Sequence, residues 1–346
     1  MPKVLGEYLD RLVTTSMTEN PAGRLTKSPR GSSLKLYELA REKQGAPLTY
    51  LAAKSLVDRV KKGDFVFIVT GAGAPPYMPK GETDGPLGAA ALARMVDLAF
   101  EAKPVMITEE EKMDALVETC NAAELAVQPE EWIRRRAYGG AVAEPFPIDD
   151  ERAWVAAEKL VAKYSPVAMI AVEKLAVGAK GVIHNMSGTD RTQHIAKVHH
   201  LVNEARRKGI LTIGIGDGGN EVGFGMIREE LKALGGIYSD CSPCPCRDGV
   251  VTVVSTDVLL PAAVSNWGVY GVEACIAAMV GNLDVIHNED VERRMLEAGV
   301  RRGLASGFGR QMLDVDGTTL EANQALITIM REMVKNFVKK VEPRAF

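Results

Sequence analysis

The segment "ILTIGIGDGGNEVGFG", residues 210–225, passes from a short apolar run into a turn that is rich in glycine and acidic side chains. Short β-branched runs of this kind are typical of strands buried on both faces of a parallel sheet. The helical pattern "MIREELKAL", residues 226–234, follows directly. The segment therefore predicts a strand, a loop and a helix in succession, and it raises the question of what the loop binds.

Similar apolar runs occur along most of the chain. They are "DFVFIVT" ending at Thr70, "PVMIT" at Thr108, "PVAMIAV" at Val172, "ILTIGI" at Ile215 and "GVVTVVS" at Ser255. Helical patterns, including residues 190–208, separate these runs. Strands that alternate with helices, without a series of hairpins, predict an α/β fold: a three-layer sandwich with a mainly parallel sheet and helices on both faces.

No linker or low-complexity segment divides the chain. Residues 1–62 are predicted to form an N-terminal helical segment, loop-like at residues 19–33, that packs on the main domain. Residues 63–346 are predicted to form a single α/β domain with helical C-terminal additions at residues 288–341. We expect the whole of the chain after Asn288 to be helical.

The composition indicates a soluble globular protein. The 346 residues are 46% hydrophobic and 25% charged, with a formal net charge of −3. No basic block carries interleaved aromatic residues, so we expect no nucleic-acid partner. The first residues have no signal-peptide pattern and polar residues interrupt the most apolar stretch, so we expect a cytoplasmic protein without membrane contact. The Ala- and Met-rich helices suggest a homo-oligomer.

Five cysteines are present, and three of them lie in "CSPCPC", as Cys241, Cys244 and Cys246. An odd number of cysteines argues against a disulfide framework. The spacing supplies three thiolates but no second pair of ligands, which favours a reduced turn over a structural zinc site. His184 lies in a polar loop, where a histidine is more often at the surface or hydrogen-bonded than a metal ligand.

Acidic residues follow the first predicted strand. Glu82, Thr83 and Asp84 lie just before Pro86, a residue that suits the first turn of a helix. For Asp84 alone, a helix cap is as good an explanation as a functional role, whereas a cap does not explain Glu82. Because ligands of open α/β sheets bind beyond the carboxyl ends of the strands, these acids are candidates for a functional site.

The glycine-rich loop permits two interpretations. Gly214, Gly216 and Gly219 match the dinucleotide pattern GxGxxG between a strand and a helix. A bound pyrophosphate, however, would face Asp217 and Glu221, and like charges at short distance repel. The alternative is that Asp217, Asn220 and Glu221 point into the cleft and, with Glu82 and Asp84, hold a divalent cation such as Mg²⁺ or Mn²⁺. We therefore expect a divalent cation and no nucleotide.

A further polar turn, "SNWG" at residues 265–268, opens a glycine- and alanine-rich helix. Ser265 suits an N-cap, but a cap at Ser265 does not explain why a second polar residue, Asn266, follows it. Asp190 also suits the cap of the helix that follows it.

Together, "ETDGP", the pair "EK" followed by "GAKGVIHNMSGTD", "IGIGDGGNEVGFG" and "AVSNWG" resemble the D-glutamate cyclase family, specifically its C-terminal domain. The resemblance covers about residues 64–281. It implies an α/β sandwich around an acidic cavity that can hold a divalent metal. It also implies a lyase reaction that closes D-glutamate into 5-oxo-D-proline with loss of water, so we expect an amino acid as the small-molecule partner.

The resemblance assigns residues by position. It implies functional roles for Glu82, Asp84, Glu173, Lys174, Asn185, Gly188, Asp190, Asp217, Asn220 and Glu221. Two departures fall where a substrate would be recognised. Lys174 replaces the usual arginine and loses its bidentate contact with a carboxylate. Ile183 and His184 stand where family members tend to have tyrosines.

These residues suggest a division of roles. Glu221 or Glu82 is expected to act as general base, with Glu173 and Lys174 also in the catalytic group. The metal ligands are expected to be Asp84, Asp217, Asp190 and Glu221. Substrate contacts are assigned to Asn185, Gly188, Arg191, Asn220, Ser265 and Asn266, and Lys174 with Arg191 would pair with a substrate carboxylate. A dinucleotide-dependent oxidoreductase and a non-catalytic small-molecule or metal-binding protein are the alternative functions.

Overall fold

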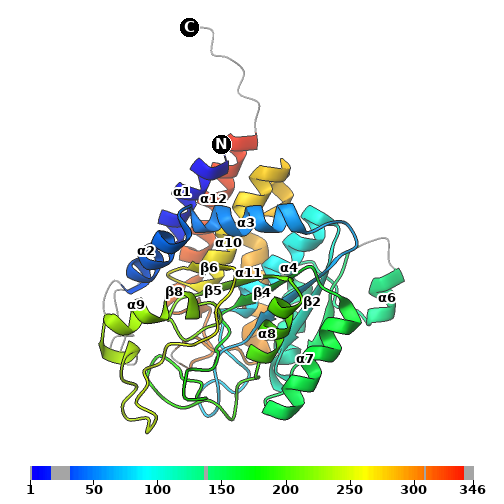
Figure 1. Cartoon of the computed structure of the whole chain (residues 1–346). Coiled ribbons are helices and arrows are strands. Elements are labelled where there is room, and N and C mark those ends of the chain that lie inside the picture. The colour runs from blue at the N-terminus through cyan, green and yellow to red at the C-terminus, as the bar shows by residue number, and fades with distance from the viewer. Residues whose placement is uncertain (1, 17–31, 136–138, 308, 339–346) are drawn as a thin grey trace, which may run out of the picture.

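A computed structural model describes residues 2–16, 32–135, 139–307 and 309–338, and a parallel sheet forms its centre (Figure 1). The sheet has six strands in the order β3-β2-β1-β4-β5-β6, and every adjacent pair is parallel. The strands are β1 (Phe65–Thr70), β2 (Lys103–Thr108), β3 (Val142–Pro145), β4 (Ala168–Val172), β5 (Leu211–Gly216) and β6 (Val258–Pro261). This arrangement confirms the predicted α/β fold with a parallel sheet.

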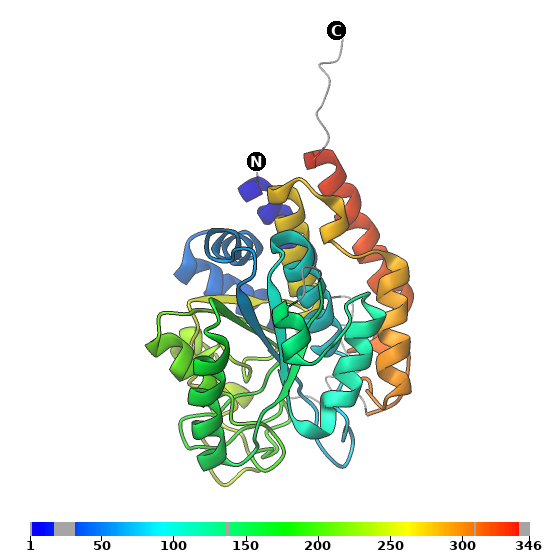
Figure 2. The same ribbon diagram turned by 90° about the vertical axis from the view of Figure 1, so that its right-hand side faces the viewer.

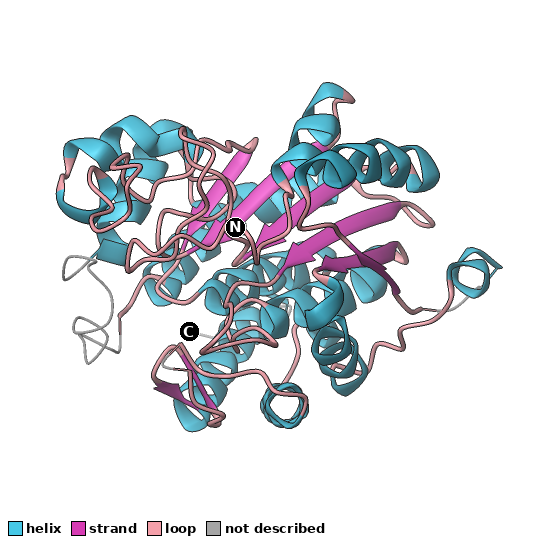
Figure 3. Cartoon of the chain, turned by 90° about the horizontal axis from the view of Figure 1, so that it is seen from below, coloured by secondary structure: helices cyan, strands magenta, loops and turns pink. Residues whose placement is uncertain are grey.

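The sheet has an apolar face on each side because successive strand residues point in opposite directions. In β1, Val66 and Ile68 belong to one hydrophobic cluster, and Phe67 and Val69 belong to the other. Helices cover both faces, as the views along and across the sheet show (Figures 2 and 3). The result is the predicted three-layer sandwich.

The first face carries most of the helices. They are α1 (Pro2–Val13), α3 (Leu48–Arg59), α4 (Pro86–Phe100), α5 (Met113–Ala122), α10 (Ser265–Val280), α11 (Glu289–Arg301) and α12 (Leu320–Val338). The second face carries α7 (Asp150–Tyr164) and α8 (His199–Arg207). Shorter or peripheral helices are α2 (Ser32–Gln44), α6 (Glu130–Arg135) and α9 (Arg228–Ala233). Helix α10 lies at the centre of the first layer, where it contacts α1, α3, α4 and α12.

The N-terminal helices are joined to each other through Asp10. Its carboxylate accepts hydrogen bonds from the backbone N–H groups of Leu48 (2.6 Å) and Thr49 (3.0 Å) at the start of α3. It also accepts one from the Tyr37 hydroxyl of α2 (2.8 Å). Leu5 and Leu9 of α1 belong to the same hydrophobic cluster as α10. The division of the chain at residue 62 stays a prediction.

The structure corrects the predicted sheet at two places. The run "GVVTVVS" is not a strand, because Thr252 and Val253 donate their backbone N–H groups to loop carbonyls of Gly219 (3.3 Å) and Val177 (3.0 Å). Most of this run is buried beneath loops instead, although Val253 is exposed, and the sixth strand is β6. Strand β3 was not predicted, since it is a short edge strand that includes Glu144.

Two helical predictions are also corrected. Within residues 190–208, regular helix begins only at His199, because the preceding residues form turns against the β4 loop. The region after Asn288 is not wholly helical: a hairpin of β7 (Asp314–Val315) and β8 (Thr318–Thr319) separates α11 from α12. Of the loop expected at residues 19–33, Ser32 and Ser33 begin α2 instead, and residues 19–31 lie outside the described residues, as do the expected helical residues 339–341.

Within the described ranges, no helix has both the length and the apolar character needed to cross a membrane.

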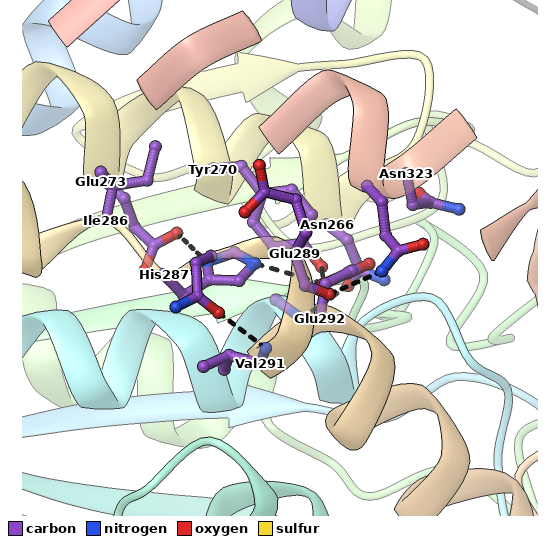
Figure 4. A network of polar contacts seen from close by, with 12 residues as sticks. Asn266, Tyr270, Glu273, Ile286, His287, Glu289, Val291, Glu292 and Asn323 are labelled. Atoms are coloured by element: carbon purple, nitrogen blue, oxygen red, sulfur yellow. Dashed lines mark hydrogen bonds and ion pairs between the residues drawn. The ribbon is translucent and has the colours of Figure 1, made fainter. Parts of the chain in front are cut away.

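A buried polar network joins α10 to α11 (Figure 4). His287 lies between two glutamates, with Nδ1 2.8 Å from Glu273 Oε2 and Nε2 3.2 Å from Glu292 Oε2. The Tyr270 hydroxyl donates to the same Glu292 oxygen at 2.8 Å, and all these side chains are fully buried. Burial disfavours the charged imidazole, but the carboxylates of Glu273 and Glu292 outweigh it and raise the pKa of His287 to about 9. The protonated ring therefore balances buried negative charge.

We expect His287→Ala to lower the free energy of unfolding by about 3–5 kcal/mol at neutral pH, since it leaves buried carboxylates without a cation. The pKa of His287 is higher in the folded protein, about 9 against 6.5. Its stabilising contribution is therefore complete below pH 6.5 and disappears as the pH rises through about 9. Denaturant unfolding at a series of pH values measures this, with exposed His194→Ala as control. A constant difference between wild type and His287→Ala across that range would contradict the assignment.

Candidate active site at the carboxyl edge of the sheet

Acidic side chains gather where the strand order reverses, between β1 and β4. They come from the loop after β1 (Glu82, Asp84), the end of β4 (Glu173), the loop after β5 (Asp217, Glu221) and the β7–β8 turn (Asp316). Loops diverge from each other at this switch point, which is where open α/β sheets bind ligands. The location therefore matches that of an active site.

Carboxylate oxygens from these separate segments lie close together. One oxygen from each of Asp84, Asp217 and Asp316 falls within 4.8 Å of the others, and the same holds for Glu173, Asp217 and Glu221. Asp217 belongs to both sets, so it lies at the centre of the cluster. The structure thus brings together the acids expected at the strand ends and adds Asp316.

The N-termini of α4 and α10 meet at the cluster. Each is capped by a side chain from the start of the other helix. Asp84, two residues before α4 begins at Pro86, accepts hydrogen bonds from the backbone N–H groups of Ser265 and Asn266 in α10, both at 2.8 Å. Asn266 in turn accepts from the N–H groups of Gly85 (2.9 Å) and Gly88 (2.8 Å) in α4. The positive ends of both helix dipoles therefore point toward the carboxylates.

Gly85 permits this close approach. Its φ angle is +99°, and a Cβ atom there would lie 2.8 Å from Thr70 Oγ1 and 2.9 Å from the Cβ of Glu173. Only glycine both adopts this positive φ readily and leaves the space that a Cβ atom would occupy free. Glu173 is itself fixed at the end of β4 by the Ser265 hydroxyl, which donates to its Oε2 at 2.5 Å.

The backbone amides of the glycine-rich loop after β5 bind a carboxylate from the same loop, that of Glu221. Glu221 Oε1 accepts from the backbone N–H of Gly218 at 2.8 Å, and Oε2 accepts from that of Gly219 at 2.7 Å. These amides are the groups that would have to hold a pyrophosphate. In addition, the dinucleotide pattern belongs after the first strand of this strand order, whereas this loop follows β5. The geometry thus disfavours the dinucleotide interpretation.

Crowding changes the acidity of the cluster. Burial, followed by the charge of Asp316, raises the pKa values of Glu82, Asp84 and Asp217 well above their usual range. Burial and the neighbouring Asp217 do the same for Glu173. Burial and Asp314 raise the pKa of Asp316 to about 6. The cluster therefore holds protons or a cation, because full ionisation of so many neighbouring buried carboxylates is costly.

A buried cationic group lies beside the acidic cluster. Lys174 Nζ is 2.6 Å from Glu109 Oε1 and donates to the Gly71 carbonyl at 2.9 Å. Lys112 Nζ is 3.3 Å from Glu109 Oε2 and has no hydrogen-bond partner among the described residues. Two lysines thus share one carboxylate, which leaves positive charge uncompensated. The charge of Lys112 also opposes the rise in the pKa of Glu82, which places the two side chains near each other.

Sequence analysis missed Glu109, Lys112 and Asp316. The first two lie in "TEEEK", directly after β2, where the rule about strand ends would have identified them. The signal for Asp316 is "DVDG", a turn pattern within the region predicted to be helical.

Other expected site residues lie outside the acidic cluster. Asn185 and Asp190 stabilise turns: Asn185 Oδ1 accepts from the Thr189 N–H at 2.9 Å, and Asp190 Oδ1 accepts from the Thr192 N–H at 2.8 Å. Arg191 donates to the Pro75 carbonyl at 3.0 Å. Asn220 donates to the His184 carbonyl at 2.7 Å, while its own Oδ1 is buried with no hydrogen-bond partner in the part of the chain that the structure describes.

Gly188 also lies at a turn, next to Cys241, with φ +80°. The functional roles assigned to all of these residues stay predictions.

Comparison with known proteins identifies the family. The family described as "D-glutamate cyclase-like, C-terminal" matches residues 30–331, which include every acid of the cluster. This chain belongs to that family. The mitochondrial D-glutamate cyclase of Homo sapiens is 27% identical over 207 residues, which are 58% of this chain and 30% of the human protein. The chain thus spans less than a third of that relative's length.

Solved structures share only a limited likeness with this member of the D-glutamate cyclase-like family. A short-chain dehydrogenase/reductase mutant from Serratia marcescens is 15% identical, with 45% of this chain and 56% of that chain covered at a TM-score of 0.25. A short-chain type dehydrogenase/reductase from Mycobacterium ulcerans is 11% identical, with 51% and 62% covered at a TM-score of 0.27. Scores at this level support no inference about function.

The crossed caps give a testable prediction. Asn266→Ala leaves the buried Gly88 N–H without an acceptor and should lower the free energy of unfolding by about 2–4 kcal/mol. Asn288→Ala is the matched control, because Asn288 caps α11 alone, through the N–H groups of Asp290 and Val291. That variant should lose only about 1 kcal/mol. Equal losses in chemical denaturation would show that the crossed caps add nothing to an ordinary cap.

Proposed function

We propose that the protein is a carbon–oxygen lyase that closes a small amino acid into a lactam with loss of water, with D-glutamate as substrate and 5-oxo-D-proline as product. The observation that carries the proposal is the pair of carboxylate sets that share Asp217 at the switch point of the sheet. Family membership supports a cyclase-type role. The name of the human relative supports the substrate.

A divalent cation suits this group of side chains. Asp84, Asp217 and Asp316 offer hard oxygen ligands within 4.8 Å of one another, which is the chemistry that Mg²⁺ and Mn²⁺ prefer. We propose that these residues hold the ion. When bound, it would supply Lewis acidity toward the substrate's distal carboxylate.

Glu82 is the better of the two proposed general bases. Glu221 is held by the amides of its own loop, whereas no described residue donates a hydrogen bond to the Glu82 carboxylate. Burial and Asp316 raise the pKa of Glu82, which makes it a stronger base than an exposed glutamate. In the proposed reaction, Glu82 takes a proton from the substrate ammonium so that the amine can attack.

Glu173 is proposed as the proton donor. Its raised pKa keeps the carboxyl group protonated at higher pH, and Ser265 fixes its orientation. The amine nitrogen forms a bond to the distal carboxyl carbon, and a C–O bond of that carboxyl breaks. The two protons that the nitrogen loses balance the two that the departing oxygen needs to leave as water. Holding the amine and the carboxyl in contact supplies about 7–11 kcal/mol toward this step.

Lys112 replaces Lys174 in the proposed contact with the substrate's other carboxylate. The Lys174 ammonium already contacts Glu109 and the Gly71 carbonyl, whereas the Lys112 ammonium keeps hydrogen-bond donors free. Lys112 also lies beside the loop that carries Glu82, because a Cβ at Gly81 would lie 3.5 Å from its Cδ. A cation at this point would hold the substrate with its amine directed toward the base.

The first test is turnover. Wild-type protein should convert D-glutamate to 5-oxo-D-proline, and EDTA should abolish the reaction until Mg²⁺ or Mn²⁺ is added back. Glu82→Gln should lower kcat at least about 100-fold, because general-base catalysis contributes that much. Glu101→Gln, at an exposed ion pair with Lys62, is the control and should keep full activity. No turnover by the wild type under any metal condition would refute the cyclase proposal, while an active Glu82→Gln would refute only the base.

The second test concerns substrate binding. Lys112→Met should raise KM for D-glutamate by about 10-fold or more, since a charge-assisted hydrogen bond is worth about 1.5–3 kcal/mol. Lys62→Met removes an exposed lysine and should leave KM unchanged. Steady-state kinetics at constant ionic strength measure both. An unchanged KM in Lys112→Met would exclude this lysine as the carboxylate contact.

A further inference from the structure

A second cluster of metal-binding side chains lies apart from the carboxylates. It consists of His184, Cys241, Cys244 and Cys246, with one ligand atom from each within 4.8 Å of the others. His184 Nε2 is 3.2 Å from the Cys244 sulfur and 3.5 Å from the Cys246 sulfur. The sulfurs of Cys241 and Cys246 are 3.2 Å apart. All five cysteines of the chain are free thiols, so no disulfide accounts for this arrangement.

The spacing fits a single tetrahedral ion. Zinc bonds of about 2.3 Å to sulfur and about 2.0 Å to nitrogen place ligand atoms about 3.5–3.8 Å from each other in a tetrahedron. The observed separations of 3.2 to 3.5 Å are close to this range. An iron–sulfur cluster, which contains several metal atoms, would need its ligands farther apart.

Two loops far apart in the sequence build the cluster. His184 lies in the loop between β4 and α8, and the cysteines lie in the loop between α9 and β6. His184, Cys241 and Cys244 are nearly fully buried. The loops approach so closely that a Cβ at Gly188 would lie 2.8 Å from the Cys241 carbonyl oxygen. Such packing orients the imidazole toward the sulfurs before any ion binds.

The remaining polar contacts agree with a role in metal binding. The Asp248 backbone N–H donates to the Cys246 sulfur, a type of contact that stabilises a ligating thiolate. His184 Nδ1 is buried without a hydrogen-bond partner among the described residues. The ring therefore makes its polar contacts through Nε2, the atom that faces the sulfurs.

We propose that His184, Cys241, Cys244 and Cys246 form a structural zinc site. Three thiolates and one imidazole are soft and borderline ligands, which select Zn²⁺ over the hard ions suited to the carboxylate cluster. Because all four positions are filled by protein, the ion has no open position for catalysis. The cysteine spacing alone favoured a reduced turn over zinc because it lacks a further ligand, and the fold supplies this ligand from a loop about 60 residues earlier.

The zinc site would act as a cross-link beside the active site. The His184 carbonyl accepts a hydrogen bond from Asn220 at 2.7 Å, and Asn220 directly precedes Glu221. Fixing His184 therefore also fixes the loop that carries Asp217 and Glu221. Neither connected loop has extensive regular secondary structure, so a bound ion would add stability that backbone pairing does not provide.

Metal analysis of the purified full-length protein tests the proposal. Protein made in zinc-supplemented medium and kept reduced should hold about one equivalent of zinc per chain. Cys244→Ser should weaken zinc binding more than about 100-fold, because loss of an outer-shell contact alone costs about 10- to 100-fold. Cys120→Ser is the control, since Cys120 is a buried cysteine in α5 outside the cluster, and it should retain full zinc.

A second measurement keeps the test decisive if Cys244→Ser does not fold. Cobalt-substituted wild-type protein should show the intense visible and charge-transfer absorption of tetrahedral thiolate-bound Co²⁺. His184→Cys should bind Co²⁺ with a shifted spectrum, because it converts the site to four thiolates. Wild-type protein without zinc and without these bands, or a Cys241–Cys246 disulfide found under reducing conditions, would overturn the proposal.

The carboxylate cluster requires a separate control, because it too can bind zinc. Asp217→Asn removes the acid common to both carboxylate sets and should leave the thiolate-bound ion in place. Zinc lost in Asp217→Asn but retained in Cys244→Ser would assign the metal to the acids and overturn the thiolate site.

Discussion

The crossed capping of α4 and α10 is the constraint on which the site depends. Asp84 satisfies the N-terminus of α10 and Asn266 satisfies that of α4, so neither helix can shift without exposing buried N–H groups of the other. Unpaired buried amides are costly, which makes the relative position of the two helices specific. The same bonds fix Asp84 next to Asp217 and place Ser265 against Glu173. Helix packing and carboxylate geometry are therefore set by one group of contacts.

Electrostatics explains how the fold tolerates so much negative charge. The N-terminal ends of α4 and α10 point at the cluster, the loop amides of Gly218 and Gly219 bind Glu221, and Lys112 lies nearby. Each offsets part of the repulsion, yet burial still raises the pKa values of Glu82, Asp84, Glu173 and Asp217. The pocket thus keeps acids that hold their protons to higher pH than exposed carboxyl groups do, a property that suits general acid–base chemistry.

The sequence predicted what depends on local patterns. Strands β1, β2, β4 and β5 follow from apolar runs with clear ends, and the meeting of Asp84 with Asp217 follows from the rule that loops at one sheet edge converge. Prediction from the sequence failed where residues are buried by loops or by distant segments and not by the sheet. The run at residues 249–255 is apolar because loops cover it, although it is not part of the sheet. The pattern "DVDG" predicts a turn at Asp316, but the approach of Asp316 to Asp84 and Asp217 depends on contacts between distant segments. The same is true of the pairing of His184 with the cysteines.

The hairpin that carries Asp316 has a consequence for biosynthesis. The acids of the pocket are spread from residue 82 to residue 316, so the ribosome releases the last of them only after most of the domain has emerged. A nascent chain can therefore pack α4 against α10 while the pocket carries one carboxylate fewer and less self-repulsion. Asp316 would then be the last of these acids to reach the pocket. Premature termination before this hairpin would remove Asp316 together with α12, which packs against α10.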